Sequence, residues 1–294
     1  MQALLRYTVL ALAAAALAGC MLRSSAAGEK SKPAARAVDL VDDARIQRDM
    51  IQRTKAMLDA GETSPMEKLF AQRKRTRCSA KLPQASTEKL TPAEIYRRLR
   101  HGVLVVTAIQ KVEEPDIYFG SSATGFVLTS SGIIVTNYHV VHDHDAEAIG
   151  VGTVDGRFFG VKEVLAADKT SDIAVLQTTG NNLTPIPLAA DAPVGSPVTV
   201  ISHPNFHFYV LTHGVVSRYY TEQHNGARRM AITADFAKGS SGGPAINEFG
   251  AAAGLVVSTE TIYYDAVEDD PRNPQMTIKA CATSRDILKL FKPR

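Results

Sequence analysis

The sequence lacks tryptophan altogether, contains only three cysteines and carries a net charge of only +3. A charge this small gives no reason to expect a nucleic-acid partner, which would require a strongly basic face. No segment repeats at the period of a solenoid. The rest of the composition is that of an ordinary globular protein, and the 294 residues suffice for one large or two small hydrophobic cores.

The N-terminus has the pattern of an export signal. The apolar run from Tyr7 to Ala18 follows Arg6 and is too short for an ordinary transmembrane helix. We therefore predict a signal peptide over residues 1–19. The run ends in Leu17-Ala18-Gly19-Cys20, which resembles a bacterial lipobox, the pattern after which the cysteine is lipidated. The alternative is a signal peptide without lipid, cut near Ala26 or Ala27.

Lipidation of Cys20 predicts a protein anchored in the membrane of a bacterial cell envelope. Because Met21 and not aspartate follows the cysteine, the sorting rules of lipoproteins favour the outer membrane, facing the periplasm, in a Gram-negative cell. Residues 20–37 are rich in Ser, Ala, Gly, Lys and Pro, as in a flexible tether.

Two further cysteines, Cys78 and Cys281, follow the export segment. Thiols of exported proteins meet an oxidising compartment, so we expect a disulfide between them. Such a bond would tie the N-terminal region to the final strand. The alternative is two free, buried thiols.

Residues 38–90 form a predicted helical region ahead of the main domain. Apolar residues line one side of a helix from Val38 to Ala60, and Ser64-Pro65-Met66-Glu67 predicts the start of a second helix that runs to Arg75. We expect these helices to form a hairpin that packs on the main domain. Inhibition or trimerisation is the alternative role. Thr91-Pro92-Ala93-Glu94 predicts another helix, with a capping box.

From residue 103 the pattern is that of short β-strands separated by turn residues. A first barrel within about 103–177 is predicted from strands at 103–109, 125–129, 133–136, 158–166 and 173–177. A second barrel within about 198–282 is predicted from strands at 198–202, 210–217, 230–233, 244–247, 252–259 and 276–282. A closing helix is predicted over residues 284–291. The predicted fold class is all-β, with two antiparallel six-stranded barrels preceded by short helices, and the domain that contains them spans residues 91–294.

The second half contains a glycine-rich turn, Lys238-Gly239-Ser240-Ser241-Gly242-Gly243-Pro244. Glycine accepts backbone angles that a Cβ forbids, so the chain can curl until the N–H groups of Gly239 and Ser241 face one point. Such a pocket stabilises negative charge on a substrate carbonyl oxygen. Serine is a weak nucleophile and needs a base, with a third group to orient that base.

Two upstream segments supply those groups. Thr136-Asn137-Tyr138-His139 follows a strand pattern, and Ser171-Asp172-Ile173 places an acid before another strand. With Ser122-Ala123-Thr124-Gly125 and Thr212-His213-Gly214-Val215, these segments resemble the trypsin-fold serine peptidases, and most of all the bacterial HtrA-like (Deg) proteases. The resemblance covers the chain from about Thr91 onward.

The resemblance implies a serine endopeptidase with the triad His139, Asp172 and Ser241 and an oxyanion hole of Gly239 and Ser241. Ser241 is chosen over Ser240 because the family's nucleophile stands directly before Gly-Gly-Pro. The implied substrates are polypeptides, such as exported or misfolded proteins, with no metal or organic cofactor. Relatives often form homotrimers and add a PDZ domain, but too few residues follow the closing helix here, so we expect none.

Family likeness also implies a pocket for the residue before the cut, walled by Phe236, Val256, Val257 and Ser258. These residue types favour small or medium apolar side chains, although Lys238 or His213 could attract an acidic one instead. Two other interpretations stay open. The barrels could bind polypeptides without catalysis, and the crowded His139, His142 and His144 could bind a metal, although a distant fourth ligand is missing.

Overall fold

A computed structural model describes residues 40–112, 117–265 and 272–291. Residues 41–294 belong to one compact unit. The predicted signal peptide, the lipidation site Cys20 and the tether lie outside the described residues. Within the described ranges, no helix combines the length and the apolar character needed to cross a membrane.

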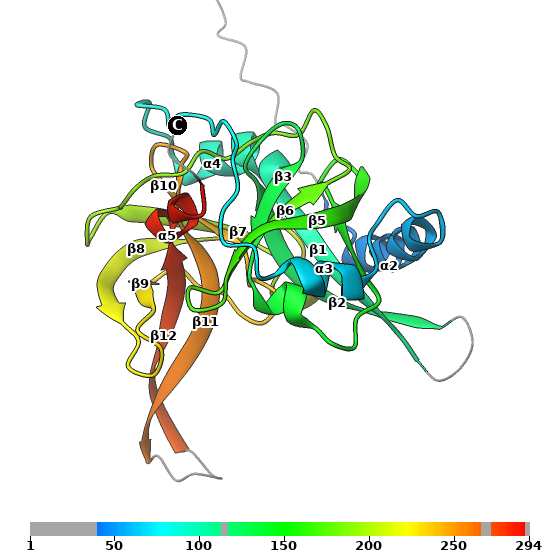
Figure 1. The fold of residues 1–294 in the computed structure, drawn as a ribbon. Coiled ribbons are helices and arrows are strands. Elements are labelled where there is room, and N and C mark those ends of the chain that lie inside the picture. The colour runs from blue at the N-terminus through cyan, green and yellow to red at the C-terminus, as the bar shows by residue number, and fades with distance from the viewer. Residues whose placement is uncertain (1–39, 113–116, 266–271, 292–294) are drawn as a thin grey trace, which may run out of the picture. The chain divides into compact units, whose positions relative to one another are not determined.

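The first half of the unit is a closed barrel with the strand order β1-β2-β3-β6-β5-β4 (Figure 1). All neighbouring strands in it are antiparallel. The strands are β1 (Val103–Lys111), β2 (Tyr118–Val127), β3 (Ile133–Thr136), β4 (Ala148–Gly152), β5 (Phe158–Asp168) and β6 (Ile173–Thr178). This barrel therefore has the six strands that the predicted fold class requires.

Strand β4 is the one that the residue pattern did not indicate, because two of its five residues are glycines. A Cβ on Gly150 would lie 2.1 Å from Thr54 Oγ1, and a Cβ on Gly152 would lie 2.5 Å from Met50 Sδ. Both Thr54 and Met50 belong to the helix that covers the strand. The glycines therefore permit close packing of helix on sheet while they weaken the strand signal.

The second half is another closed antiparallel barrel, with the order β10-β11-β12-β9-β8-β7. Its strands are β7 (Pro197–Ser202), β8 (Val210–Thr221), β9 (Arg228–Ile232), β10 (Pro244–Asn247), β11 (Ala252–Asp265) and β12 (Arg272–Thr283). Helix α5 (Ser284–Lys289) follows, and the Thr283 hydroxyl accepts a hydrogen bond from the N–H of Asp286 at its start. The predicted fold class, two six-stranded barrels, is confirmed.

Three hydrophobic clusters hold the barrels. One fills the first barrel and includes Leu104, Ile134 and Leu176, and another fills the second barrel and includes Val200 and Met230. A third cluster joins residues of both, among them Phe126, Ile201, Ile246 and Leu255. The two barrels therefore share a packed seam, and burial at this seam fixes their relative position.

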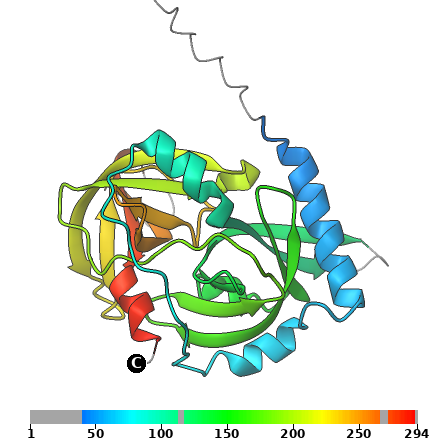
Figure 2. The same cartoon turned by 90° about the horizontal axis from the view of Figure 1, so that it is seen from above.

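The N-terminal helices are α2 (Asp43–Asp59), α3 (Met66–Gln72) and α4 (Pro92–Leu99). Helix α4 has the predicted capping box between Thr91 and Glu94. The predicted hairpin of the first two helices is wrong, since Figure 2 shows α2 and α3 following different sides of the first barrel. The Ser64 hydroxyl does not cap α3 but donates to the carbonyl of Lys162 on β5 at 2.6 Å, so the sheet has taken the capping side chain.

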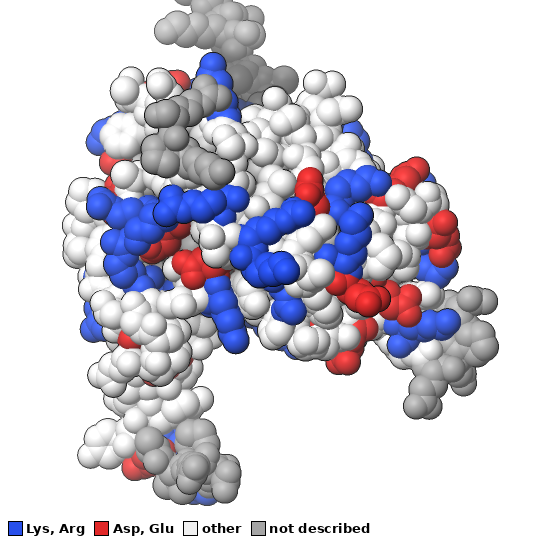
Figure 3. Space-filling model, in the orientation of Figure 1, with Lys and Arg blue, Asp and Glu red and all other residues white. Residues whose placement is uncertain are grey.

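Three short 3₁₀ helices complete the described structure: η1 (Arg100–Gly102), η2 (His139–His142) and η3 (Pro204–Phe206). On the face drawn in Figure 3, basic side chains form a band with acidic side chains among them. Ion pairs between side chains of the described residues include Arg75–Glu163 and Arg285–Asp191.

Candidate active site

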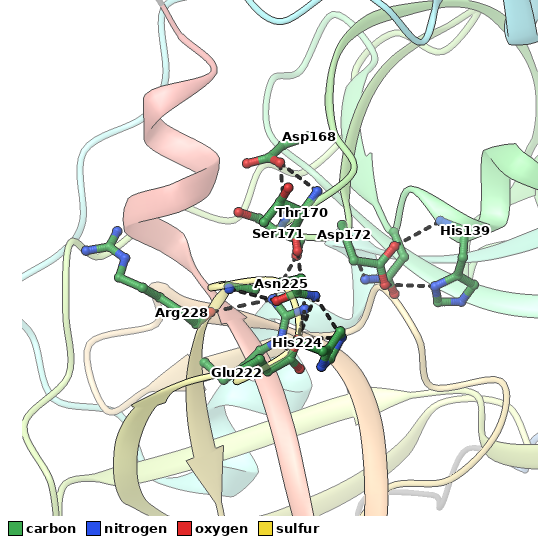
Figure 4. A network of polar contacts seen from close by, with 12 residues as sticks. His139, Asp168, Thr170, Ser171, Asp172, Glu222, His224, Asn225 and Arg228 are labelled. Atoms are coloured by element: carbon green, nitrogen blue, oxygen red, sulfur yellow. Dashed lines mark hydrogen bonds and ion pairs between the residues drawn. The ribbon is translucent and has the colours of Figure 1, made fainter.

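His139 and Asp172 lie side by side because their strands are neighbours. Strand β3 ends three residues before His139, and β6 begins directly after Asp172. These strands pair with Thr136 opposite Ala174. The Asp172 carboxylate contacts the ring Nδ1 of His139 at 2.8 Å, and its other oxygen accepts from the His139 backbone N–H at 2.9 Å (Figure 4).

These contacts determine which ring nitrogen of His139 is available for chemistry. An ionised carboxylate only accepts hydrogen bonds, so Nδ1 carries the proton. Nε2 then keeps a lone pair, and the side chain is 51% exposed. A neutral imidazole in this tautomer can take a proton from a neighbouring hydroxyl.

The two serines of the glycine-rich turn have different surroundings. Ser240 is fully buried, and its hydroxyl accepts hydrogen bonds from the Ser202 hydroxyl at 3.0 Å and from the Ala237 N–H at 3.4 Å. Ser241 is partly exposed, and within the described ranges its hydroxyl has no hydrogen-bond partner. Within the described residues, the His139 ring is therefore hydrogen-bonded to Asp172 but not to Ser241. Of the two hydroxyls, only that of Ser241 is available to a substrate.

The turn is held against the first barrel by backbone contacts. The N–H of Thr124 on β2 donates to the carbonyl of Ser241 at 2.8 Å. Gly242 has φ +87°, and a Cβ there would lie 2.0 Å from the carbonyl oxygen of Thr124. Only glycine allows this approach, so Ser241 is fixed at the seam of the barrels, on the side where β2 passes.

The backbone of Gly239 is oriented from the opposite side. The N–H of Asn205 donates to the carbonyl of Lys238 at 2.7 Å. In a trans peptide the carbonyl and the next N–H point in opposite directions, so the N–H of Gly239 points away from Asn205. Within the described part of the chain, neither this N–H nor that of Ser241 donates to another group. Both predicted oxyanion donors are therefore available.

The four predicted specificity residues differ in their burial. The side chains of Phe236 and Val256 lie in the core of the second barrel, and that of Val256 is only 1% exposed. Val257 packs against the seam cluster, and Ser258 is exposed. The backbone of Val256 pairs with Gly242 and Gly243 of the glycine-rich turn. Strand alternation turns its side chain inward.

A cavity of about 260 Å³ lies beside the turn and was missed by the sequence reasoning. Phe119 from β2, Asn205 and Phe206 from η3, and Lys238 with Gly239 contribute to its walls. The signal that could have found it is the Pro204-Asn205-Phe206 segment. Asn205 and Phe206 both have positive φ, and asparagine is enriched in that conformation.

The predicted disulfide is wrong in this structure. Cys78 and Cys281 are both free and both buried. Cys78 belongs to the seam cluster, whereas Cys281 points into the core of the second barrel. Burial raises the pKa of the Cys78 thiol to about 11 and also raises that of Cys281, which makes both thiols poor nucleophiles.

Comparison with known proteins places this arrangement in a class. Residues 123–255 match the trypsin-like peptidase domain family. This part of the chain is therefore similar to trypsin-like peptidase domains, and its curated relatives include Do-like and HTRA2 proteases. It contains His139, Asp172 and Ser241.

Two curated relatives match about half of the chain. Protease Do-like 5, chloroplastic, of Arabidopsis thaliana is 33% identical over 157 residues, which cover 48% of this chain and 49% of that protein. Serine protease HTRA2, mitochondrial, of Drosophila virilis is 33% identical over 143 residues, 46% of this chain and 34% of that protein. The chain thus spans half or less of the length of these curated relatives.

Solved structures share the fold. An HtrA-type protease with a tripeptide superposes with a TM-score of 0.56 at 19% identity, over 68% of this chain and 62% of the other. The serine endoprotease from Yersinia pestis superposes with a TM-score of 0.51 at 23% identity, over 69% and 65%. At these identities the likeness concerns the fold.

Proposed function

We propose that this protein is a serine endopeptidase that hydrolyses peptide bonds of polypeptides through His139, Asp172 and Ser241. The observation that carries the proposal is the hydrogen-bonded His139–Asp172 pair. The same barrel seam holds the partly exposed Ser241 beside two N–H groups, those of Gly239 and Ser241, that donate to no group of the described residues. The homology of residues 123–255 to HtrA/Deg proteases supports the same reaction.

In the proposed reaction, Ser241 Oγ bonds to the peptide carbonyl carbon while His139 Nε2 takes the hydroxyl proton. The carbonyl electron pair moves to the oxygen, which the N–H groups of Gly239 and Ser241 stabilise. The C–N bond then breaks, and His139 returns the proton to the leaving amine. Water repeats the sequence on the acyl-enzyme and releases the acid. Asp172 keeps the imidazole in the required tautomer.

The adjacent serines provide a matched test. Ser241→Ala and Ser240→Ala each remove one hydroxyl from the same turn. We expect Ser241→Ala to abolish labelling by a fluorophosphonate probe and to lower casein cleavage by several orders of magnitude. Ser240→Ala loses the two hydrogen bonds that this buried hydroxyl accepts, each worth about 1 kcal/mol of stability, and should still label at Ser241. Casein cleavage that survives in purified Ser241→Ala protein would refute the assignment.

A second candidate function is polypeptide binding without catalysis. The absence of a hydrogen bond between Ser241 and His139 within the described residues favours it. Catalytic hydrogen bonds are often long without substrate, however, so this geometry does not exclude catalysis. A wild-type protein that neither labels nor cleaves casein, yet retains casein on a column, would favour the binder.

The proposed location is the bacterial envelope, with Cys20 lipidated at the outer membrane and the domain facing the periplasm. The Leu17-Ala18-Gly19-Cys20 pattern supports this. A Cys20→Ala variant should fail to incorporate a labelled fatty acid and should leave the membrane fraction. Exported or misfolded proteins are then the proposed substrates. Homotrimeric assembly, implied by the family likeness, would give three times the monomer mass in light scattering.

A further inference from the structure

Arg229 connects the second barrel to the loop that carries Asp172. It belongs to β9, and its side chain is only 3% exposed. Its guanidinium donates to the carbonyl of Ser171 at 3.1 Å and, more weakly, to that of Thr170 at 3.5 Å. A buried arginine with two carbonyl contacts on a neighbouring loop is a specific cross-link between the barrels.

Glu222 holds the arginine in place. One carboxylate oxygen accepts from Arg229 Nε at 2.9 Å, and the other accepts from Nη2 at 3.3 Å. The Asn225 side chain donates to the same carboxylate at 2.9 Å. Figure 4 shows Glu222, His224 and Asn225 together below Ser171, with Asp172 and His139 to one side. The paired carboxylate balances the buried charge, and the two-point contact fixes the direction of the guanidinium.

The contact to Ser171 acts on the backbone of Asp172. Asp172 has φ +61°, in the left-handed region that non-glycine residues occupy at a cost. The Ser171 carbonyl belongs to the peptide before the Asp172 Cα, and Arg229 holds it. The Asp172 carbonyl belongs to the peptide after that Cα, and the Asn137 side chain holds it at 2.8 Å. Together the two contacts hold the peptides on either side of the Asp172 Cα and hence the direction of its Cα–Cβ bond, from which the carboxylate reaches His139.

We propose that Arg229, held by Glu222, is a positioning residue that keeps Asp172 in the orientation that contacts His139. This inference rests on the proposed peptidase function. Local contacts within the loop, such as those from the Thr170 and Ser171 N–H groups to Asp168, shape the turn but do not reach the second barrel. The orientation of Asp172 therefore depends on a residue that the triad motifs do not include.

The neighbouring Arg228 provides a matched control. It lies on the same strand, but its guanidinium pairs with Asp286 at 2.6 Å and not with the Asp172 loop. Asp286 keeps Lys289 and the Thr283 hydroxyl as partners when Arg228 is replaced. Arg228→Met and Arg229→Met thus make the same chemical change on one strand. Only Arg229→Met removes the proposed contact to the Asp172 loop.

The test measures kcat and KM on a casein-derived peptide together with hydrogen exchange of the segment 168–173. We expect Arg229→Met to lower kcat by about 10- to 100-fold with KM within about threefold, because misplacing a catalytic group by about 1 Å can cost about 10²-fold. Amide hydrogen exchange in the segment 168–173 should become faster in Arg229→Met. Arg229→Lys should recover part of kcat, and Arg228→Met should stay within about twofold of wild type.

Equal kcat in the two methionine variants, or unchanged exchange of the segment 168–173, would overturn the proposal. If circular dichroism shows that Arg229→Met does not fold, Glu222→Gln is tested in its place, because it keeps Arg229 but weakens the carboxylate contact that holds it. A kcat of Glu222→Gln equal to that of the wild type would then count against the proposal. A wild-type protein without peptidase activity would end the proposed function instead, and the exchange comparison would still decide whether Arg229 holds the Asp172 loop.

Discussion

The backbone N–H of Asn205 donates a 2.7 Å hydrogen bond to the carbonyl of Lys238, and this contact sets the direction of the next N–H, that of Gly239. Asn205 follows β7, whereas Lys238 follows β9, so the two meet only because both strands belong to the second barrel. The proposed oxyanion hole is therefore held by a loop far from it in the sequence.

The first prediction concerns Gly239. It has φ +94°, and a Cβ there would lie 2.5 Å from the carbonyl oxygen of His203. Gly239→Ala should displace the turn and misdirect one oxyanion donor, lowering the rate of fluorophosphonate labelling by about 10²- to 10³-fold. Gly195→Ala is the control, because Gly195 has φ +86° and a Cβ there would meet nothing within 4 Å. If both variants label equally slowly, backbone strain alone is responsible.

The second prediction tests whether helix α2 supports the site. The Asp43 carboxylate accepts from the N–H of Phe208 at 2.9 Å, in the loop that carries Asn205. Asp43→Ala should lower the labelling rate about fivefold, the equivalent of about 1 kcal/mol for one lost hydrogen bond. Asp42→Ala removes the helix N-cap to Arg45 but leaves the loop contact, so it should label normally. Faster labelling of Asp43→Ala would indicate that α2 inhibits.

The third prediction is a pH dependence of stability. His203 is fully buried, and burial lowers its pKa to about 3 despite the opposing effect of the Leu104 and Ser202 backbone. Between about pH 6.5 and 3 the unfolded chain binds a proton at this histidine that the folded protein does not. The free energy of unfolding should therefore fall on acidification, by up to about 1.4 kcal/mol per pH unit from this group.

Urea unfolding at a series of pH values measures this slope. In the wild type, His203 Nδ1 accepts a hydrogen bond from the Tyr209 N–H at 3.0 Å. His203→Asn keeps an acceptor near this position, but the asparagine side chain cannot take up a proton. Its stability at pH 7 should be lower than that of wild type, with a shallower decline toward pH 4. Parallel curves for the two proteins would show that His203 is not the titrating group.

The fourth prediction concerns the thiols. Cys78 and Cys281 are free and buried, so in the folded protein these two thiols should resist iodoacetamide at pH 7. After unfolding in denaturant without reductant, peptide mapping should find Cys78 and Cys281 alkylated. A linked peptide containing both would mean that the disulfide forms in the exported protein.

Much of the fold was readable from local patterns. Strands β3 and β10 begin and end where the alternation of β-branched and turn residues predicted, and the Thr91 capping box is present, because strand and cap conformations depend on neighbouring residues. Strand β4 was missed because its glycines serve the contact with α2. The position of α3 followed from Ser64 bonding to β5, which no local pattern encodes.

The sequence by itself predicted the two-barrel fold and suggested the proposed triad of His139, Asp172 and Ser241, because each of these residues lies in a short motif whose chemistry is local. Tertiary structure alone decided which serine is accessible, where Val256 points, and that the thiols stay apart. It also introduced Asn205 and Arg229, whose roles depend on carbonyls brought to them by barrel closure. A hydrogen bond to a distant backbone group places no constraint on neighbouring residue types, so it leaves no pattern in the sequence.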